Sequence, residues 1–133
     1  MNKIGKFGED IACKFLMKRG YKIVERNYSR KWGELDVVAK KAGKICFVEV
    51  KTVSCEMSAE IGANSGEYVT RATGYRPEDN MNKKKIAKFL RIIQTYLQDK
   101  HLGKVEWSMS LVAIRVDTVK KKAKVRFIED LIF

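Results

Sequence analysis

Apolar residues recur at helical spacing in two separate stretches of the chain. Between Lys3 and Arg19 they stand at positions 4, 7, 11, 12, 15 and 16, and Gly20 follows as a natural stop for a helix. A second periodic stretch runs from Met81 to Gln98. The side chains expected to be buried there are Ile86, Phe89, Leu90, Ile93 and Leu97. The spacing predicts two amphipathic helices.

Five shorter segments have the alternation or the continuous apolar run of β-strands. They are Tyr21–Tyr28, Glu34–Lys40, Ile45–Lys51, Val105–Val116 and Lys124–Ile128. Short turn-like pieces join the first three, which predicts an antiparallel meander. The third segment is apolar on both faces, as a central strand is. The order helix, three strands, helix, two strands predicts an α/β fold, with a central mixed sheet flanked by helices.

Length and composition favour one globular domain spanning residues 1–133. Within it, Ser54–Asn80 has little periodicity and is rich in Gly, Ser, Ala, Asn and Thr, so we expect a long mobile loop. No apolar stretch is as long as a membrane span, and the N-terminus lacks the apolar run of a secretion signal. We therefore expect a cytoplasmic protein without a membrane partner.

The chain is strongly basic, with 28 Lys and Arg against 16 Asp and Glu and a net charge of +12. Basic residues concentrate after position 80, and many of them lie on the second predicted helix. A basic surplus favours a polyanionic partner, because lysines and arginines that neutralise phosphates release counterions from nucleic acid. The predicted phosphate-contacting residues are Lys83, Lys84, Lys85, Lys88 and Arg91. The alternatives are a solvated helix face and charge that serves solubility alone.

Two carboxylates and a lysine stand at matching places in the second and third predicted strands. Glu49 and Lys51 share one face by the two-residue period of a strand. If the two strands pair through the turn at Lys41–Lys44, Asp36 stands beside Glu49 near one end of the sheet. Two such carboxylates repel each other unless a divalent cation lies between them, and their hard oxygen atoms suit Mg²⁺ or Mn²⁺. Lys51 would then orient or help deprotonate a water and steady the charge on a phosphate.

A simpler interpretation of the same residues is the wet face of an antiparallel sheet, where charged side chains commonly alternate. The context favours a site, because Glu49 and Lys51 end an otherwise apolar strand, where unpaired charge is costly. The helical spacing also places Glu9 at the border of the first helix's apolar arc, with small neighbours at Gly5 and Gly8.

Four motifs then carry a resemblance to a known family. Gly5–Ala12, Gly20–Tyr28, Gly33–Val38 and Phe47–Lys51 resemble, in the same order, the motifs of the YraN-like family of small bacterial proteins. That family is assigned to the PD-(D/E)XK nuclease superfamily and is related to Holliday-junction resolvases. The resemblance implies a restriction-endonuclease-like fold and a Mg²⁺- or Mn²⁺-dependent endonuclease acting on nucleic acid, DNA rather than RNA, including branched DNA.

The resemblance also implies roles for individual residues. It gives Glu9, Asp36, Glu49 and Lys51 as catalytic residues, with Asp36 and Glu49 as the metal ligands. Junction-cleaving relatives make two symmetric cuts with two sites, so a homodimer is a further implication.

Three departures from the family pattern keep other functions open. Val53 stands where an arginine is usual, Ser54–Asn80 is longer than usual, and Met109–Val112 replaces an Arg-Phe-Asp-Val-like sequence. The second hypothesis is therefore a non-catalytic nucleic-acid-binding module of the same fold. A third is a protein-interaction domain whose charge serves solubility.

Overall fold

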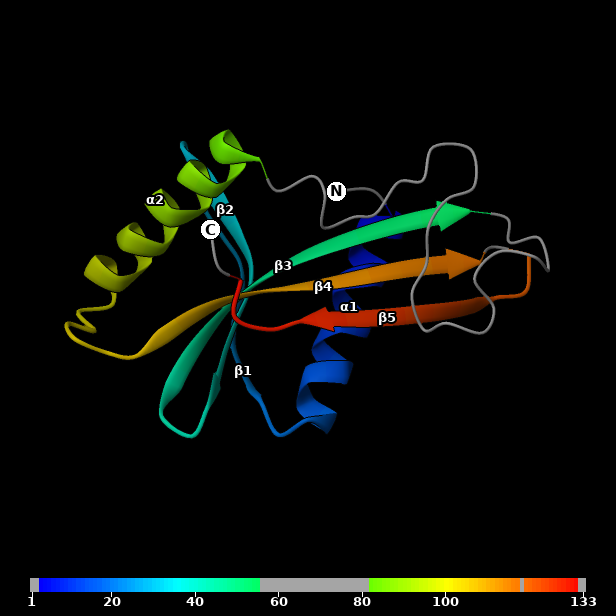
Figure 1. The fold of residues 1–133 in the computed structure, drawn as a ribbon, viewed down its shortest axis with the longest axis horizontal. Coiled ribbons are helices and arrows are strands. Elements are labelled where there is room, and N and C mark those ends of the chain that lie inside the picture. The colour runs from blue at the N-terminus through cyan, green and yellow to red at the C-terminus, as the bar shows by residue number, and fades with distance from the viewer. Residues whose placement is uncertain (1–2, 56–81, 118, 132–133) are drawn as a thin grey trace.

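The computed structural model of the chain describes residues 3–55, 82–117 and 119–131 (Figure 1). Its elements are α1 (Lys3–Lys18), β1 (Lys22–Arg30), β2 (Gly33–Lys41), β3 (Lys44–Cys55), α2 (Lys83–Asp99), β4 (Trp107–Asp117) and β5 (Lys122–Ile128). The predicted order of two helices and five strands is confirmed. Of the predicted loop, the first two residues belong to the end of β3, and positions 56–80 lie outside the described residues.

The strands form one mixed sheet in the order β1-β2-β3-β4-β5. Strands β3 and β4 pair in parallel, and the other neighbouring strands pair antiparallel. A parallel pair needs a long crossover connection, and α2 lies in the stretch between β3 and β4. The architecture is consistent with the predicted restriction-endonuclease-like fold.

The two helices pack on opposite faces of the sheet and bury two separate cores. Alternation along β3 divides them: Phe47 belongs to the core on the α2 side, and Cys46 and Val48 belong to the core on the α1 side. Figure 1 shows α1 behind β3, β4 and β5, and α2 beside the end of the sheet where β2 lies. The apolar third strand is therefore central and covered on both sides, as its sequence predicts.

The buried face of α2 differs from the predicted one. Ile92 and Tyr96 are buried, whereas Leu90 is 37% exposed. Ile92 fits closely against Gly33 of β2, where a Cβ atom would lie 3.2 Å from the isoleucine Cβ. Tyr96 packs edge-on against Phe47, with ring centroids 5.6 Å apart. The helix is thus rotated toward β2, and this rotation turns its Lys85 and Lys88 toward the sheet.

Helix boundaries follow local signals in the sequence. Gly20 has φ +92°, a left-handed conformation that glycine adopts without strain, and its N–H donates to the carbonyl of Met17 at the end of α1. Asn82 caps α2 by accepting a hydrogen bond from the Lys85 amide at 3.0 Å. In the part of the chain that the structure describes, neither helix is long and apolar enough to cross a membrane.

Candidate active site

Asp36 lies where β2 stops pairing with β3. The last paired residues are Val37 and Val48, and Asp36 and Glu49 are the next residues on the two strands. One carboxylate oxygen of Asp36 accepts a hydrogen bond from the Val50 amide at 2.9 Å. The side chain thus takes the place of the backbone carbonyl that would otherwise continue the ladder, and this holds the carboxylate at the point where the strands separate.

At the same point, the alternation of side chains between the two faces of the sheet is interrupted in both β1 and β2. Leu35 and Val37 are two positions apart, yet Leu35 belongs to the core on the α2 side and Val37 to the core on the α1 side. Their partners in β1 show the same change: Tyr28 is in the α2-side core, and Arg26 reaches α1. Asn27 between them has φ +55°, which asparagine tolerates better than bulky residues do. The aspartate opposite it is thereby kept out of either apolar core.

The pKa of Asp36 is raised to about 8. Burial is the main cause and the charge of Glu49 is the second, while the hydrogen bond from the Val50 amide acts in the opposite direction. The charges of Glu9 and Glu34 raise the pKa further. The fold therefore brings Asp36 and Glu49 together, as their strand positions predict, and brings Glu9 within electrostatic reach.

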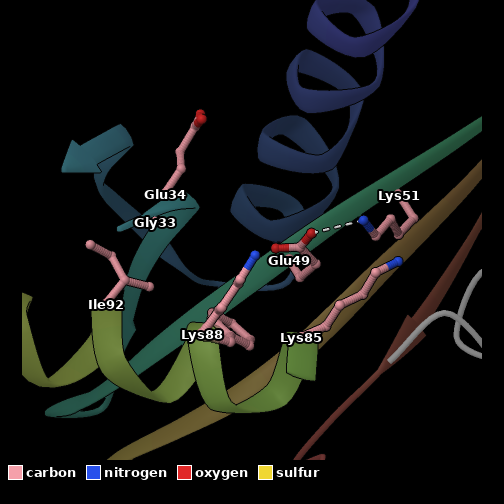
Figure 2. Close-up of a pocket in the computed structure, with 8 residues that line it drawn as sticks. Gly33, Glu34, Glu49, Lys51, Lys85, Lys88 and Ile92 are labelled. Atoms are coloured by element: carbon pink, nitrogen blue, oxygen red, sulfur yellow. Dashed lines mark ion pairs between the residues drawn. The ribbon is translucent and has the colours of Figure 1, made fainter. Parts of the chain in front are cut away.

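Glu49 and Lys51 form an ion pair on the α2 side of β3. The lysine Nζ lies 3.2 Å from Glu49 Oε1, and both side chains are partly buried. They line a pocket of about 230 Å³ between β3, the start of β2 and the first turns of α2. Figure 2 shows Lys85 and Lys88 reaching from α2 toward this pair. Three ammonium groups and the Glu49 carboxylate therefore line a space that suits a phosphate group, and Glu34, which also lines it, points away from Glu49 in Figure 2.

Glu9 approaches from the α1 side of the sheet and is 8% exposed. The preceding residue, Gly8, makes this possible, because a Cβ atom there would overlap Thr52 of β3. The absence of a side chain lets α1 lie close against the strand. Glu9 Oε1 is buried without a hydrogen bond and lies 3.5 Å from Arg26 Nη2.

The predicted phosphate-contacting residues of α2 divide into two groups. Lys85 and Lys88 line the pocket. Lys83 and Lys84 are exposed and are not among its lining residues. Arg91 places its guanidinium 5.1 Å from the ring centroid of Trp32. That indole in turn donates a hydrogen bond to the Thr95 hydroxyl at 2.9 Å, so Trp32 covers α2.

Sequence reasoning missed two features of the site. It gave no role to Arg26, although this residue lies within the second family motif, because its partners are on another element, α1. It also missed the amide of Val50, since a backbone donor leaves no mark in the sequence.

The donor atoms fit a hard divalent cation. Among residues 3–55, 82–117 and 119–131, no group of three or more His, Cys, Asp and Glu side chains is arranged to hold a metal. Mg²⁺ is commonly bound by one or two carboxylates, with waters and substrate phosphate completing its shell. Asp36 and Glu49 match that smaller set, and their mutual repulsion, visible in the raised pKa of Asp36, is what a cation would relieve.

This chain is similar to proteins of a known family. The sequence pattern of the uncharacterised protein family UPF0102 matches residues 8–121, a range that includes every predicted site residue. A UPF0102 protein of Alkaliphilus oremlandii is 34% identical over 128 residues, which are 96% of each chain. One of Syntrophomonas wolfei is 35% identical over 123 residues, 92% of this chain and 93% of the relative. One of Thermotoga petrophila is 59% identical over 49 residues, 37% of this chain and 45% of the relative.

Proposed function

We propose that this chain, which belongs to the uncharacterised protein family UPF0102, is a divalent-metal-dependent nuclease that hydrolyses phosphodiester bonds in nucleic acid. UPF0102 is the YraN-like family, so the family resemblance drawn from the four motifs is confirmed. The observation that carries the proposal is the pocket itself. The ion pair of Glu49 and Lys51 lines it, and Lys85 and Lys88 line it from α2. Asp36 and Glu9 are not among its lining residues, but the charges of Glu49 and Glu9 both raise the pKa of Asp36.

The carboxylates of Asp36 and Glu49 would hold Mg²⁺ or Mn²⁺. When bound, such an ion lowers the pKa of a water and neutralises charge on a phosphate. Lys51, ion-paired with Glu49, orients the attacking water and stabilises the negative charge that builds up on the phosphate. Lys85 and Lys88 hold the phosphate from the opposite wall. Glu9 completes the acidic set from the α1 side.

The substrate class follows from the charges and from the family. The lysines at the pocket suit a phosphate backbone, and contacts to phosphates position a protein on nucleic acid without reading its sequence. We propose DNA, including branched DNA, as the substrate, with a homodimer as the form that makes two cuts.

Cleavage assays on junction, flap and single-stranded DNA with Mg²⁺ and Mn²⁺ test the proposal. We expect Asp36→Asn, Glu49→Gln and Lys51→Gln each to lower the rate about a hundredfold or more. Glu25→Gln is the control, because Glu25 lies on β1, is not among the lining residues of the pocket and pairs with Lys100 at 3.4 Å. Cleavage that persists undiminished in Asp36→Asn would refute the assigned site.

A second candidate function is a nucleic-acid-binding module that does not cut. One observation favours it: Leu111 of β4 is paired with Glu49, at the position where the family pattern has an aspartate. Salt-dependent DNA binding by wild type, with neither cleavage nor Mn²⁺ binding, would support this function over the first.

A further inference from the structure

Arg26 is shared between two consecutive acids of α1. Its Nη2 atom lies 2.9 Å from Asp10 Oδ1 and 3.5 Å from Glu9 Oε1. The Asp10 side chain is 45% exposed and the Glu9 side chain is 10% exposed. The guanidinium therefore makes its hydrogen bond to the outer acid and only a longer ion pair to the inner one.

The inner acid is left in an unusual state. Glu9 is 8% exposed, and its Oε1 atom has no hydrogen-bond donor among the described residues. Buried carboxylate oxygens are ordinarily hydrogen-bonded, because desolvating them without a partner is costly. The charge of Glu9 also raises the pKa of Asp36, so Glu9 lies within electrostatic range of that carboxyl.

We propose that Asp10 and Arg26 are positioning residues that set how strongly Glu9 attracts the divalent cation of the site. Asp10 holds the guanidinium toward solvent and keeps it from closing on Glu9. Arg26 in turn offsets part of the Glu9 charge, which would otherwise destabilise the folded protein. The inference rests on the proposed function, since it concerns the same metal site.

The two residues then have opposite effects on metal affinity. In Asp10→Asn the outer partner loses its negative charge, so the guanidinium shifts toward Glu9 and Mn²⁺ binding weakens by about threefold or more. In Arg26→Gln the Glu9 charge is uncompensated, so Mn²⁺ binding tightens by a similar factor while the protein becomes less stable. A role in stability alone predicts lower stability in both variants and no opposite change in affinity.

The experiment is a calorimetric Mn²⁺ titration of the whole chain, accompanied by thermal unfolding without metal. Arg26→Lys keeps the charge and is expected to restore affinity near that of wild type. The matched control is Glu25→Gln, which removes another ion pair of β1, the one with Lys100 at 3.4 Å, and should leave Mn²⁺ affinity unchanged. Glu9→Gln removes the group through which both residues act, so adding Asp10→Asn to it should cause no further change.

Each outcome separates the inference from the proposed function. Opposite shifts in Asp10→Asn and Arg26→Gln support the inference. Wild-type binding that is unchanged in both folded variants, or shifted in the same direction, overturns the inference and leaves the metal site standing. Absence of Mn²⁺ binding by wild type overturns the metal site and the inference together.

Discussion

Asp36 is the residue at which the demands of folding and of the proposed chemistry oppose each other most. Burial and the nearby charge of Glu49 both disfavour the ionised form of Asp36. The hydrogen bond from the Val50 amide favours the ionised form. Its neighbours are compensated differently: Glu49 by Lys51, and Glu9 by Arg26. A strongly perturbed carboxyl beside a polar pocket is typical of a functional site, where stability is given up for activity.

This conflict predicts how stability depends on pH. The folded pKa of Asp36 is about 8, whereas an aspartate in an unfolded chain has a pKa of about 3.9. Between these values the folded protein keeps the proton and the unfolded chain releases it, so the free energy of unfolding falls as pH rises toward 8. Asp36→Asn keeps a hydrogen-bond acceptor and removes this titration. At pH 8 without metal, we expect the variant to be more stable than wild type by about 2 kcal/mol or more.

Urea unfolding of both proteins at pH 5, 6.5 and 8 measures this effect. Ionisable groups far from Asp36 contribute equally to the two proteins, so the difference between their free energies of unfolding reports Asp36 together with the acids that repel it, Glu49 first. A difference that stays constant over this range would contradict the raised pKa.

At this scale the sequence predicts carboxylates and lysines on strands better than it predicts their partners. Asp36, Glu49 and Lys51 follow from alternation and a short turn. The ion pairs of Arg26 depend on how α1 lies against β1, and the hydrogen bond from Val50 depends on where the β2–β3 ladder ends. Neither depends on a local pattern.

The contact between α1 and β3 places Glu9, and it depends on Gly8. In an exposed helix, alanine is more favourable than glycine by about 1 kcal/mol. Here a Cβ atom would overlap the Thr52 side chain, so Gly8→Ala must displace α1 from the strand. We expect a net destabilisation of about 1–3 kcal/mol, measured by urea unfolding.

The second variant of this test is Thr52→Ala. It removes two of the three threonine atoms that the new Cβ would meet. The double variant should recover part of the loss caused by Gly8→Ala, as a double-mutant cycle reveals. Losses that simply add would mean that the two side chains do not compete for space.

Helix α2 shows what periodicity predicts and what packing decides. The predicted range differs from the observed one by two residues at the start and one at the end. Periodicity alone could not predict which face of α2 is buried. Ile92 is buried because it fits against Gly33, and the same rotation of the helix leaves Leu90 exposed. For the same reason, the sequence could not predict which lysines of α2 line the pocket.

The first turn of α2 contains three lysines and no acid, although the N-terminus of a helix carries positive partial charge. Such placement is slightly unfavourable unless an anion binds there. We expect Lys85→Gln and Lys88→Gln each to weaken DNA binding and to reduce the slope of log affinity against log salt by about 1.

Fluorescence anisotropy over a range of salt concentrations measures that slope. Lys83→Gln is the matched control, because Lys83 is an exposed lysine of the same turn that is not among the lining residues of the pocket. Equal loss in all three variants would indicate general attraction by a basic helix and no phosphate position at the pocket.

In the whole molecule, the candidate site gathers four elements from three layers: α1, the strands β2 and β3 of the sheet, and α2. Glu9 comes from α1, Asp36 from β2 and Glu49 from β3, and the lysines that face Glu49 come from α2 on the other side of the sheet. The fold class was predictable, because the order of elements and the apolar third strand leave few arrangements. The register of the parallel pair β3 and β4 could not be predicted, because it pairs Glu49 with Leu111, and α2 and a long connection separate these residues in the chain.

Because Glu49 and Glu9 repel the Asp36 carboxylate only in the folded chain, a bound cation should stabilise the whole protein. At a hundredfold excess over its dissociation constant, Mn²⁺ would add about 2.7 kcal/mol to the free energy of unfolding. The gain should be larger at pH 8 than at pH 6, because at pH 6 the cation must displace the proton that Asp36 keeps. Thermal unfolding with and without MnCl₂ at both pH values measures it.

The variants decide where the cation binds. Asp36→Asn should lose most of the Mn²⁺ stabilisation at both pH values, whereas Glu25→Gln should keep it, because Glu25 lies on β1 and pairs with Lys100. Equal stabilisation of wild type and Asp36→Asn would place the cation elsewhere. A wild type that gains nothing from Mn²⁺ at pH 8 would instead favour the non-catalytic module, since the repulsion at Asp36 would then serve no metal.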